Sequence, residues 1–259
     1  MSQPVALFSV ILVIRMRMKQ LSLTLATLML LLSACKEKPG NLTVQVNTTY
    51  GSQGFALNTV YTNPDGRKVK FEKFKMYIAH IALIKNDNSE KEIKDVALLN
   101  WEDAGSLKIS AKDVDGEYKG IKFYLGLDSL QNNSDPSAFS SSHPLSGDQG
   151  LYWTWLHSYI FESLDGKADT TTSGSANFNL GLSYHVGGNS FYRQVVLYKD
   201  FSLCCNNGLT LNLGFDVQKI FYGTSQQIDV VTERATASDD LPALAAKFAD
   251  NCSQSFTLN

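Results

Sequence analysis

Alternation of apolar and polar residues is the feature that most constrains the fold of this chain. Between Leu209 and Val217 every second side chain is apolar, and the residues between them are Thr, Asn, Gly and Asp. A period of two places one set of side chains on one face of a β-strand. Comparable runs occur in six further segments: Leu42–Val46, Phe74–Lys85, Gly120–Leu125, Tyr152–Phe161, Phe178–His185 and Gln194–Phe201.

These runs, separated by Asn- and Gly-rich turns, predict an all-β fold, an antiparallel β-sandwich-like single domain. The apolar fraction of 44% is enough for a sizeable core and excludes disorder of the whole chain. Residues 240–251 have the spacing of an amphipathic helix, with Asp239 or Asp240 as its cap, so we expect one short C-terminal helix. The longest irregular segment, Ser129–Gly150, is of a length typical of functional or mobile loops.

The N-terminus resembles a bacterial lipoprotein signal peptide. Basic residues at positions 15, 17 and 19 precede an apolar run, Leu21–Leu32, which is too short to span a bilayer. Ser and Ala then precede Cys35, the residue that such proteins lipidate. We therefore expect a signal peptide at residues 1–34, a lipidated tether at 35–41 and the β-domain at 42–259. The alternative is an ordinary secretory signal in which Cys35 is incidental.

Lipidation predicts a protein anchored in the cell envelope by its acyl chains. Lys36, rather than Asp, follows Cys35, which favours the outer membrane and leaves its periplasmic and surface faces open. Removal of residues 1–34, which hold three basic residues and no acidic one, changes 23 basic and 25 acidic residues to 20 and 25, a net charge of -5. This balance argues against binding to nucleic acid.

Three further cysteines would lie in an oxidising compartment. We expect a disulfide that joins Cys204 or Cys205 to Cys252 and leaves one thiol over. The alternative for the adjacent pair is a soft-metal site.

The densest set of candidate functional residues lies in Tyr152–Phe161. On a continuous strand Trp153, Trp155 and His157 would share one face. His185 ends another predicted strand, beside two glycines, so the two imidazoles could meet if these strands are neighbours.

Two imidazoles in an apolar pocket would suit Cu(I) or Cu(II). Met76 is the only methionine after the signal segment, which excludes a methionine-rich copper shuttle. The competing interpretation is that both tryptophans are core residues and that the histidines have structural roles. For His80 we favour the structural role, and His143 is as well explained as a solvated loop residue. No GxSxG, HExxH or P-loop motif indicates an enzyme.

Taken in order, five motifs between Leu42 and Phe221 resemble the MbnP-like copper-binding family, relatives of a methanobactin-associated protein and of methanotroph surface copper proteins. The motifs are Phe74–Ile81, Ile121–Ser129, His143–Leu145, Leu151–Trp155 and Tyr184–Gly188.

The resemblance implies a β-rich fold and one copper ion held by two histidines and a tryptophan oxidised to kynurenine. The Trp155-Leu156-His157 spacing matches that of some relatives, His185 is the second expected ligand, and His143 is a rival. It also implies one partner, a di-haem peroxidase that oxidises the tryptophan. A copper-uptake receptor is a further expected partner.

We thus expect a copper-binding envelope lipoprotein for uptake, storage or delivery, and not an enzyme. The alternatives are a metal-free surface lipoprotein that binds a glycan or a protein, and a copper oxidase, for which no substrate pocket can be argued.

Overall fold

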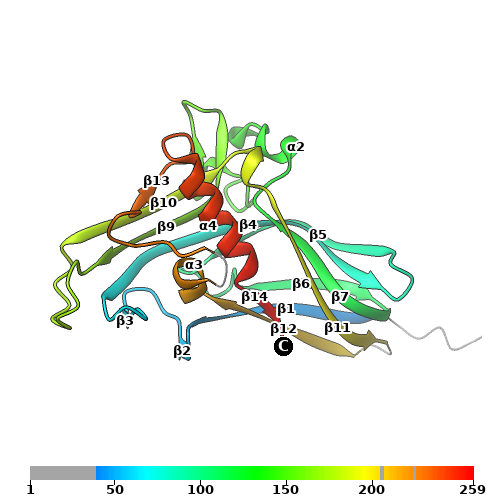
Figure 1. Ribbon diagram of the computed structural model, residues 1–259. Coiled ribbons are helices and arrows are strands. Elements are labelled where there is room, and N and C mark those ends of the chain that lie inside the picture. Colours follow the sequence, from blue (N-terminus) through cyan, green and yellow to red (C-terminus); the bar gives the residue numbers. More distant parts are fainter. Residues whose placement is uncertain (1–38, 205–206, 224–225) are drawn as a thin grey trace, which may run out of the picture. The chain divides into compact units, whose positions relative to one another are not determined.

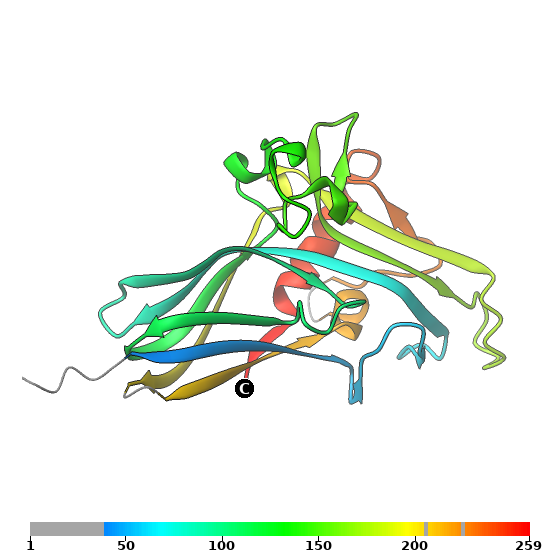
Figure 2. The same ribbon diagram turned by 180° about the vertical axis from the view of Figure 1, so that it is seen from behind.

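The computed structural model describes residues 39–204, 207–223 and 226–259, which form two β-sheets and a few short helices (Figures 1 and 2). The smaller sheet has the strand order β14-β12-β1-β2, with β6 also paired to β1. Its strands are β1 (Gly40–Tyr50), β2 (Gln53–Gly54), β6 (Lys108–Val114), β12 (Gly208–Asp216) and β14 (Phe256–Leu258).

The larger sheet has the order β11-β7-β4-β9-β10-β13, with β3 and β5 paired to β4 and β8 paired to β9. Its strands are β3 (Val60–Thr62), β4 (Lys68–Lys85), β5 (Glu90–Asn100), β7 (Gly116–Leu125), β8 (Tyr152–Trp153), β9 (Ser158–Ala168), β10 (Leu180–Gly187), β11 (Arg193–Leu203) and β13 (Ala235–Thr236). The helices are α2 (Ser129–Asn132), α3 (Gln218–Tyr222) and α4 (Pro242–Gln254), with 3-10 turns at Pro136–Ala138, Gly147–Gln149 and Asn189–Phe191.

The predicted all-β fold is confirmed, although the sheets are mixed rather than purely antiparallel. β1 runs parallel to β12, and β10 runs parallel to β13. In the first pair Leu42, Val44 and Val46 lie opposite Leu209, Leu211 and Leu213. The two alternating segments thus bury matching faces, as a period of two requires.

The main core is formed by buried side chains of both sheets and of α4 (Figure 1). Tyr184 of β10 stacks on Phe248 of α4 with ring centroids 5.0 Å apart, and Phe221 of α3 meets Tyr184 edge-on at 5.5 Å. All three rings are fully buried. The C-terminal helix is therefore a packing element of the core.

A second, smaller apolar cluster lies on the outer face of the larger sheet. Tyr77 of β4 and Phe161 of β9 pack there against Leu127, Leu145 and Trp153. Figure 2 shows the covering segments, α2, its following loop and the β8–β9 hairpin, gathered on that side. Segment 129–150, predicted as a loop, thus contains α2 and two 3-10 turns.

Two local predictions are wrong. Tyr152–Phe161 is not one strand, because residues 154–157 form the turn of a hairpin in which Tyr152 pairs with Tyr159. The C-terminal helix starts at Pro242 with Leu241 at its cap position, and neither Asp239 nor Asp240 caps it. Proline is well suited to the first turn because its missing N–H would be unpaired there.

Glu162 of β9 is an exception within the apolar core. It is fully buried, and neither carboxylate oxygen has a hydrogen-bond partner within the described part of the chain. Burial raises the pKa of Glu162 to about 8, against the opposing effect of the Arg193 charge. The side chain is therefore a neutral acid at pH 7.

Truncation of Phe248 to alanine should lower the free energy of unfolding by about 3–5 kcal/mol, because it leaves a cavity between α4 and the sheet. Tyr198 is the matched aromatic control, since it is exposed on β11. Tyr198→Ala should change stability by less than about 1 kcal/mol. Urea unfolding measures both, and equal losses would contradict this packing role of α4.

Glu162 should make stability depend on pH. The unfolded chain releases this proton near the ordinary value of 4.5 and the folded chain near 8, so stability falls as pH rises between them. The loss is on the order of 5 kcal/mol. Glu162→Leu should remove this pH dependence. The free energy of unfolding of the variant, measured in urea, should therefore rise relative to that of the wild type as the pH increases. A difference independent of pH would contradict the buried neutral acid.

Candidate metal centre

His80 lies at an irregularity in β4. His80 and Ile81 together lie opposite one residue of β7, Phe123, between the pairs formed by Ala79 and Ala82. Such a bulge redirects side chains and accounts for the left-handed backbone of His80, with φ of 48°. The imidazole is carried on the outer face, edge-on to Tyr124 at 6.3 Å between ring centroids.

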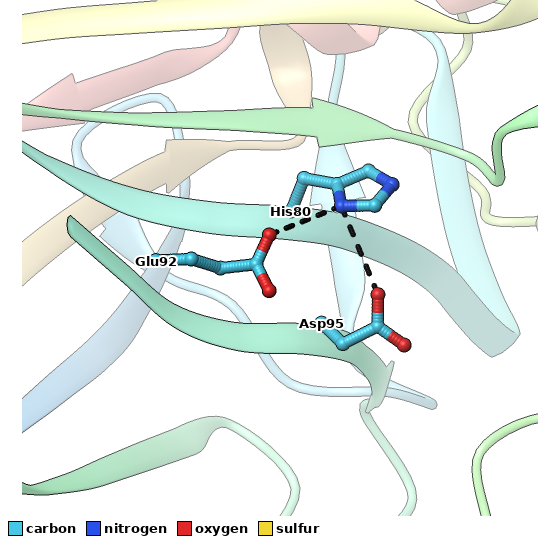
Figure 3. A group of neighbouring side chains, drawn as sticks. All are labelled: His80, Glu92 and Asp95. Carbon is cyan, nitrogen blue, oxygen red and sulfur yellow. Dashed lines mark hydrogen bonds and ion pairs between the residues drawn. The ribbon is translucent and has the colours of Figure 1, made fainter. Parts of the chain in front are cut away.

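Two carboxylates of β5 approach one nitrogen of this imidazole (Figure 3). Nδ1 of His80 lies 3.2 Å from Oε2 of Glu92 and 3.7 Å from Oδ1 of Asp95. The three potential ligand atoms lie within 4.8 Å of one another. In the described part of the chain, no other three His, Cys, Asp or Glu side chains bring ligand atoms this close.

The other side of the imidazole is held by the start of α2. Nε2 of His80 lies 2.9 Å from Oδ2 of Asp128, the N-cap residue. Oδ1 of Asp128 accepts the backbone N–H of Gln131 at 2.8 Å, and Gln131 donates its side-chain amide to Oδ1 of Asp95 at 2.9 Å. A chain of hydrogen bonds through Asp128 and Gln131 therefore connects His80 to the carboxylate of Asp95.

The electrostatics of this cluster favour charged groups. Partial burial lowers the pKa of His80, but hydrogen bonds with Asp128 and Glu92 outweigh it and raise the pKa above its ordinary value. For Asp128, partial burial raises the pKa, but hydrogen bonds from Gln131 and His80 outweigh it and leave that pKa below the usual range. Without a metal, the surrounding carboxylates thus stabilise the protonated form of the His80 imidazole.

The donor set is one imidazole nitrogen and carboxylate oxygens. This set suits borderline divalent metals, and Cu(II) binds such nitrogen and oxygen sites more tightly than the other first-row divalent ions. Glu92 and Asp95 are more than half exposed, so an ion could reach them from solvent. The residues therefore fit copper in its divalent state.

His157 lies elsewhere, in the turn of the β8–β9 hairpin. It is exposed and has a left-handed backbone, with φ of 48°. It lines a pocket of about 560 Å³ together with Tyr152, Thr154 and Asp135.

His185 does not meet His157, although their strands are neighbours as the sequence suggested. His185 lies opposite Ser163 of β9, five residues and roughly 17 Å of strand from Ser158, whereas His157 precedes β9 in the hairpin turn. Its Nε2 lies 3.1 Å from Oδ1 of Asp165, which also accepts the hydroxyl of Ser183. The predicted convergence is therefore absent because the register separates the two rings.

The two tryptophans do not form one wall. Trp153 is buried against Gly187, whereas Trp155, in the turn, has 72% of its surface exposed. Their ring centroids lie 6.4 Å apart. The break in the strand thus separates them into a core residue and a surface residue.

His143 has a structural role in its loop. Its Nδ1 accepts the backbone N–H of Leu145 at 3.1 Å, and its ring stacks on Phe139 with centroids 4.4 Å apart. Nδ1 is therefore occupied.

Cys252 is a free thiol on the inward face of α4, and burial raises its pKa well above the ordinary value. The predicted bridge to it is not formed: the Cys252 thiol lies in the core, whereas Cys204 is at the surface. Cys204 is exposed after β11. Cys205, the signal segment 1–34 and Cys35 lie outside the described residues.

The sequence reasoning assigned His80 a structural role and missed Glu92 and Asp95. One signal was available: Glu90–Asn100 follows the strand of His80 after a short polar turn, so a hairpin would place its acids beside the imidazole. The bulge that selects which side chains meet has no comparable signal.

The fold and this site describe a β-sandwich with a metal-capable outer face. The chain belongs to the MbnP family, whose model matches residues 39–240. Its fold is similar to that of MbnP from Methylosinus trichosporium, with a TM-score of 0.56 and 17% identity over 80% of this chain and 87% of that chain. No curated protein matches the sequence.

The helices in the described part of the chain are all too short or too polar to cross a membrane.

Proposed function

We propose that this protein binds one copper ion at His80, Glu92 and Asp95 and serves in copper uptake, storage or delivery. The observation that carries the proposal is the convergence of these three ligand atoms within 4.8 Å. Membership of the MbnP family supports copper as the metal. His80 would supply Nδ1, and the two carboxylates would supply oxygen.

A second candidate site for the ion lies in the hairpin turn. Trp155 is exposed to an oxidising partner such as a di-haem peroxidase, and His157 follows two residues later. Oxidation to kynurenine would give an aromatic amine beside this imidazole. His185 would not contribute, because its strand register holds it apart.

The proposed setting is the cell envelope. The signal-like segment ending at Cys35 supports a lipid anchor, with the outer membrane as the favoured location and an uptake receptor as a partner. An anchored protein with an open metal site would hold copper at the membrane surface.

Copper content of His→Ala variants distinguishes the candidate sites. His80→Ala should reduce bound Cu(II) from about one ion per chain to none, because it removes the only nitrogen donor of the cluster. His157→Ala and His185→Ala should keep the ion and serve as matched controls. Elemental analysis of the full chain in detergent, with Cys204 and Cys205 replaced by Ser, measures this.

Full copper content in His80→Ala would contradict the proposed site. If His157→Ala and Trp155→Phe lose copper instead, and peptide mass analysis finds kynurenine at Trp155, the hairpin holds the ion. Absence of copper from the wild type after metal is supplied would favour a metal-free lipoprotein that binds a glycan or a protein.

A further inference from the structure

The three carboxylates around His80 carry more negative charge than one imidazole can balance. Glu92, Asp95 and Asp128 all approach the same ring. Among the ion pairs of the described residues, none links any of the three to a lysine or an arginine. A cation at Nδ1 would therefore meet unbalanced negative charge.

His80 and Asp95 already make the additional hydrogen bonds that metal ligands usually make to residues outside the metal site. A metal-bound histidine commonly donates its other N–H to a carboxylate, and ligating carboxylates are themselves hydrogen-bonded. Asp128 takes the first role at Nε2 of His80, and Gln131 takes the second by donating to Asp95. Asp128 is the N-cap of α2 and Gln131 lies within that helix, and neither belongs to the three ligands.

α2 is itself fixed to the sheet. Its residue Asn132 accepts the backbone N–H of Tyr159 at 2.9 Å and the hydroxyl of Ser158 at 3.2 Å, and its amide donates to Asn189 at 3.0 Å. A capping box formed by Asp128 and Gln131 closes its first turn. Asp128 and Gln131, which contact His80 and Asp95, are therefore held in place by a helix that is hydrogen-bonded to its neighbours.

His185 provides an internal comparison. Its Nε2 also meets a carboxylate, that of Asp165, but no further His, Cys, Asp or Glu of the described chain converges on it. An imidazole paired with a carboxylate therefore occurs at both His185 and His80, whereas the group of three carboxylates occurs only at His80 among the described residues.

We infer that Asp128 and Gln131 are positioning residues that set His80 and Asp95 to bind copper in its divalent form, Cu(II), in preference to Cu(I). The inference rests on the proposed function. Carboxylate oxygens favour the harder divalent ion, whereas Cu(I) favours sulfur ligands, and Cys252 is buried in the core instead. A divalent ion would also balance the two ligating carboxylates.

Asp128→Asn tests the positioning role, because asparagine retains the N-cap while removing the charge from Nε2. The variant should bind Cu(II) about 10–100-fold more weakly, as measured by competition with a chelator. Its electron paramagnetic resonance spectrum should shift and its melting temperature should stay unchanged. Gln131→Met should weaken binding in the same direction by releasing Asp95.

Asp135→Asn is the matched control, since Asp135 caps the next helical turn through Ser137 and is not one of the three carboxylates around His80. It should bind Cu(II) as the wild type does. All variants use the full chain in detergent with Cys204 and Cys205 replaced by Ser. A second titration uses Cu(I) under argon with excess reductant, in the wild type and in His80→Ala.

Wild-type affinity and spectrum in Asp128→Asn would overturn the positioning role. Cu(I) that binds the wild type as tightly as Cu(II) and is lost in His80→Ala would overturn the preference for the divalent ion. Both results leave the proposed copper site standing, provided that His80→Ala loses Cu(II). Retention of Cu(II) in His80→Ala would instead refute the proposed copper site itself.

Discussion

Burial of β4 on both faces is the constraint on which the rest of the structure depends. This strand pairs with β3, β5, β7 and β9, and the run from Met76 to Ala79 is buried without interruption. A strand covered on both sides needs an apolar layer above and below it. The smaller sheet and α4 supply the inner layer, and α2, its loop and the β8–β9 hairpin supply the outer one.

His80 sits where the outer layer ends. The bulge at His80 and Ile81 interrupts the pairing with β7, so the imidazole leaves the apolar pattern and reaches the polar edge beside β5. The chain that leaves β7 then starts α2 at Asp128, on the far side of the same ring. A metal-capable cluster therefore arises where two covering elements meet around one irregular residue.

Periodicity was enough to predict the fold class and most strands, because burial of alternate side chains is a local pattern. It failed at residues 154–157, where Trp155 and Leu156 are large apolar residues in a turn and gave no turn signal. It could not give register, which depends on pairs far apart in sequence. For that reason His157 and His185 were predicted to meet, while Glu92 and Asp95 were overlooked.

The order of the five motifs identified the family correctly, but a motif does not fix a site. His143 and Trp153 belong to such motifs, yet one has its Nδ1 engaged within its loop and the other is packed against Gly187. Both residues thus help to build the outer layer of this chain.

Accessibility distinguishes the His80 cluster from a structural metal site. A structural site surrounds its ion with protein ligands, whereas Glu92 and Asp95 are 53% and 65% exposed at their side chains. An ion held there would have protein on one side and water on the other. Ligands of another molecule could replace that water without any rearrangement of β4. The contacts from α2 would meanwhile keep the imidazole in place, so such a site could both hold an ion firmly and pass it on.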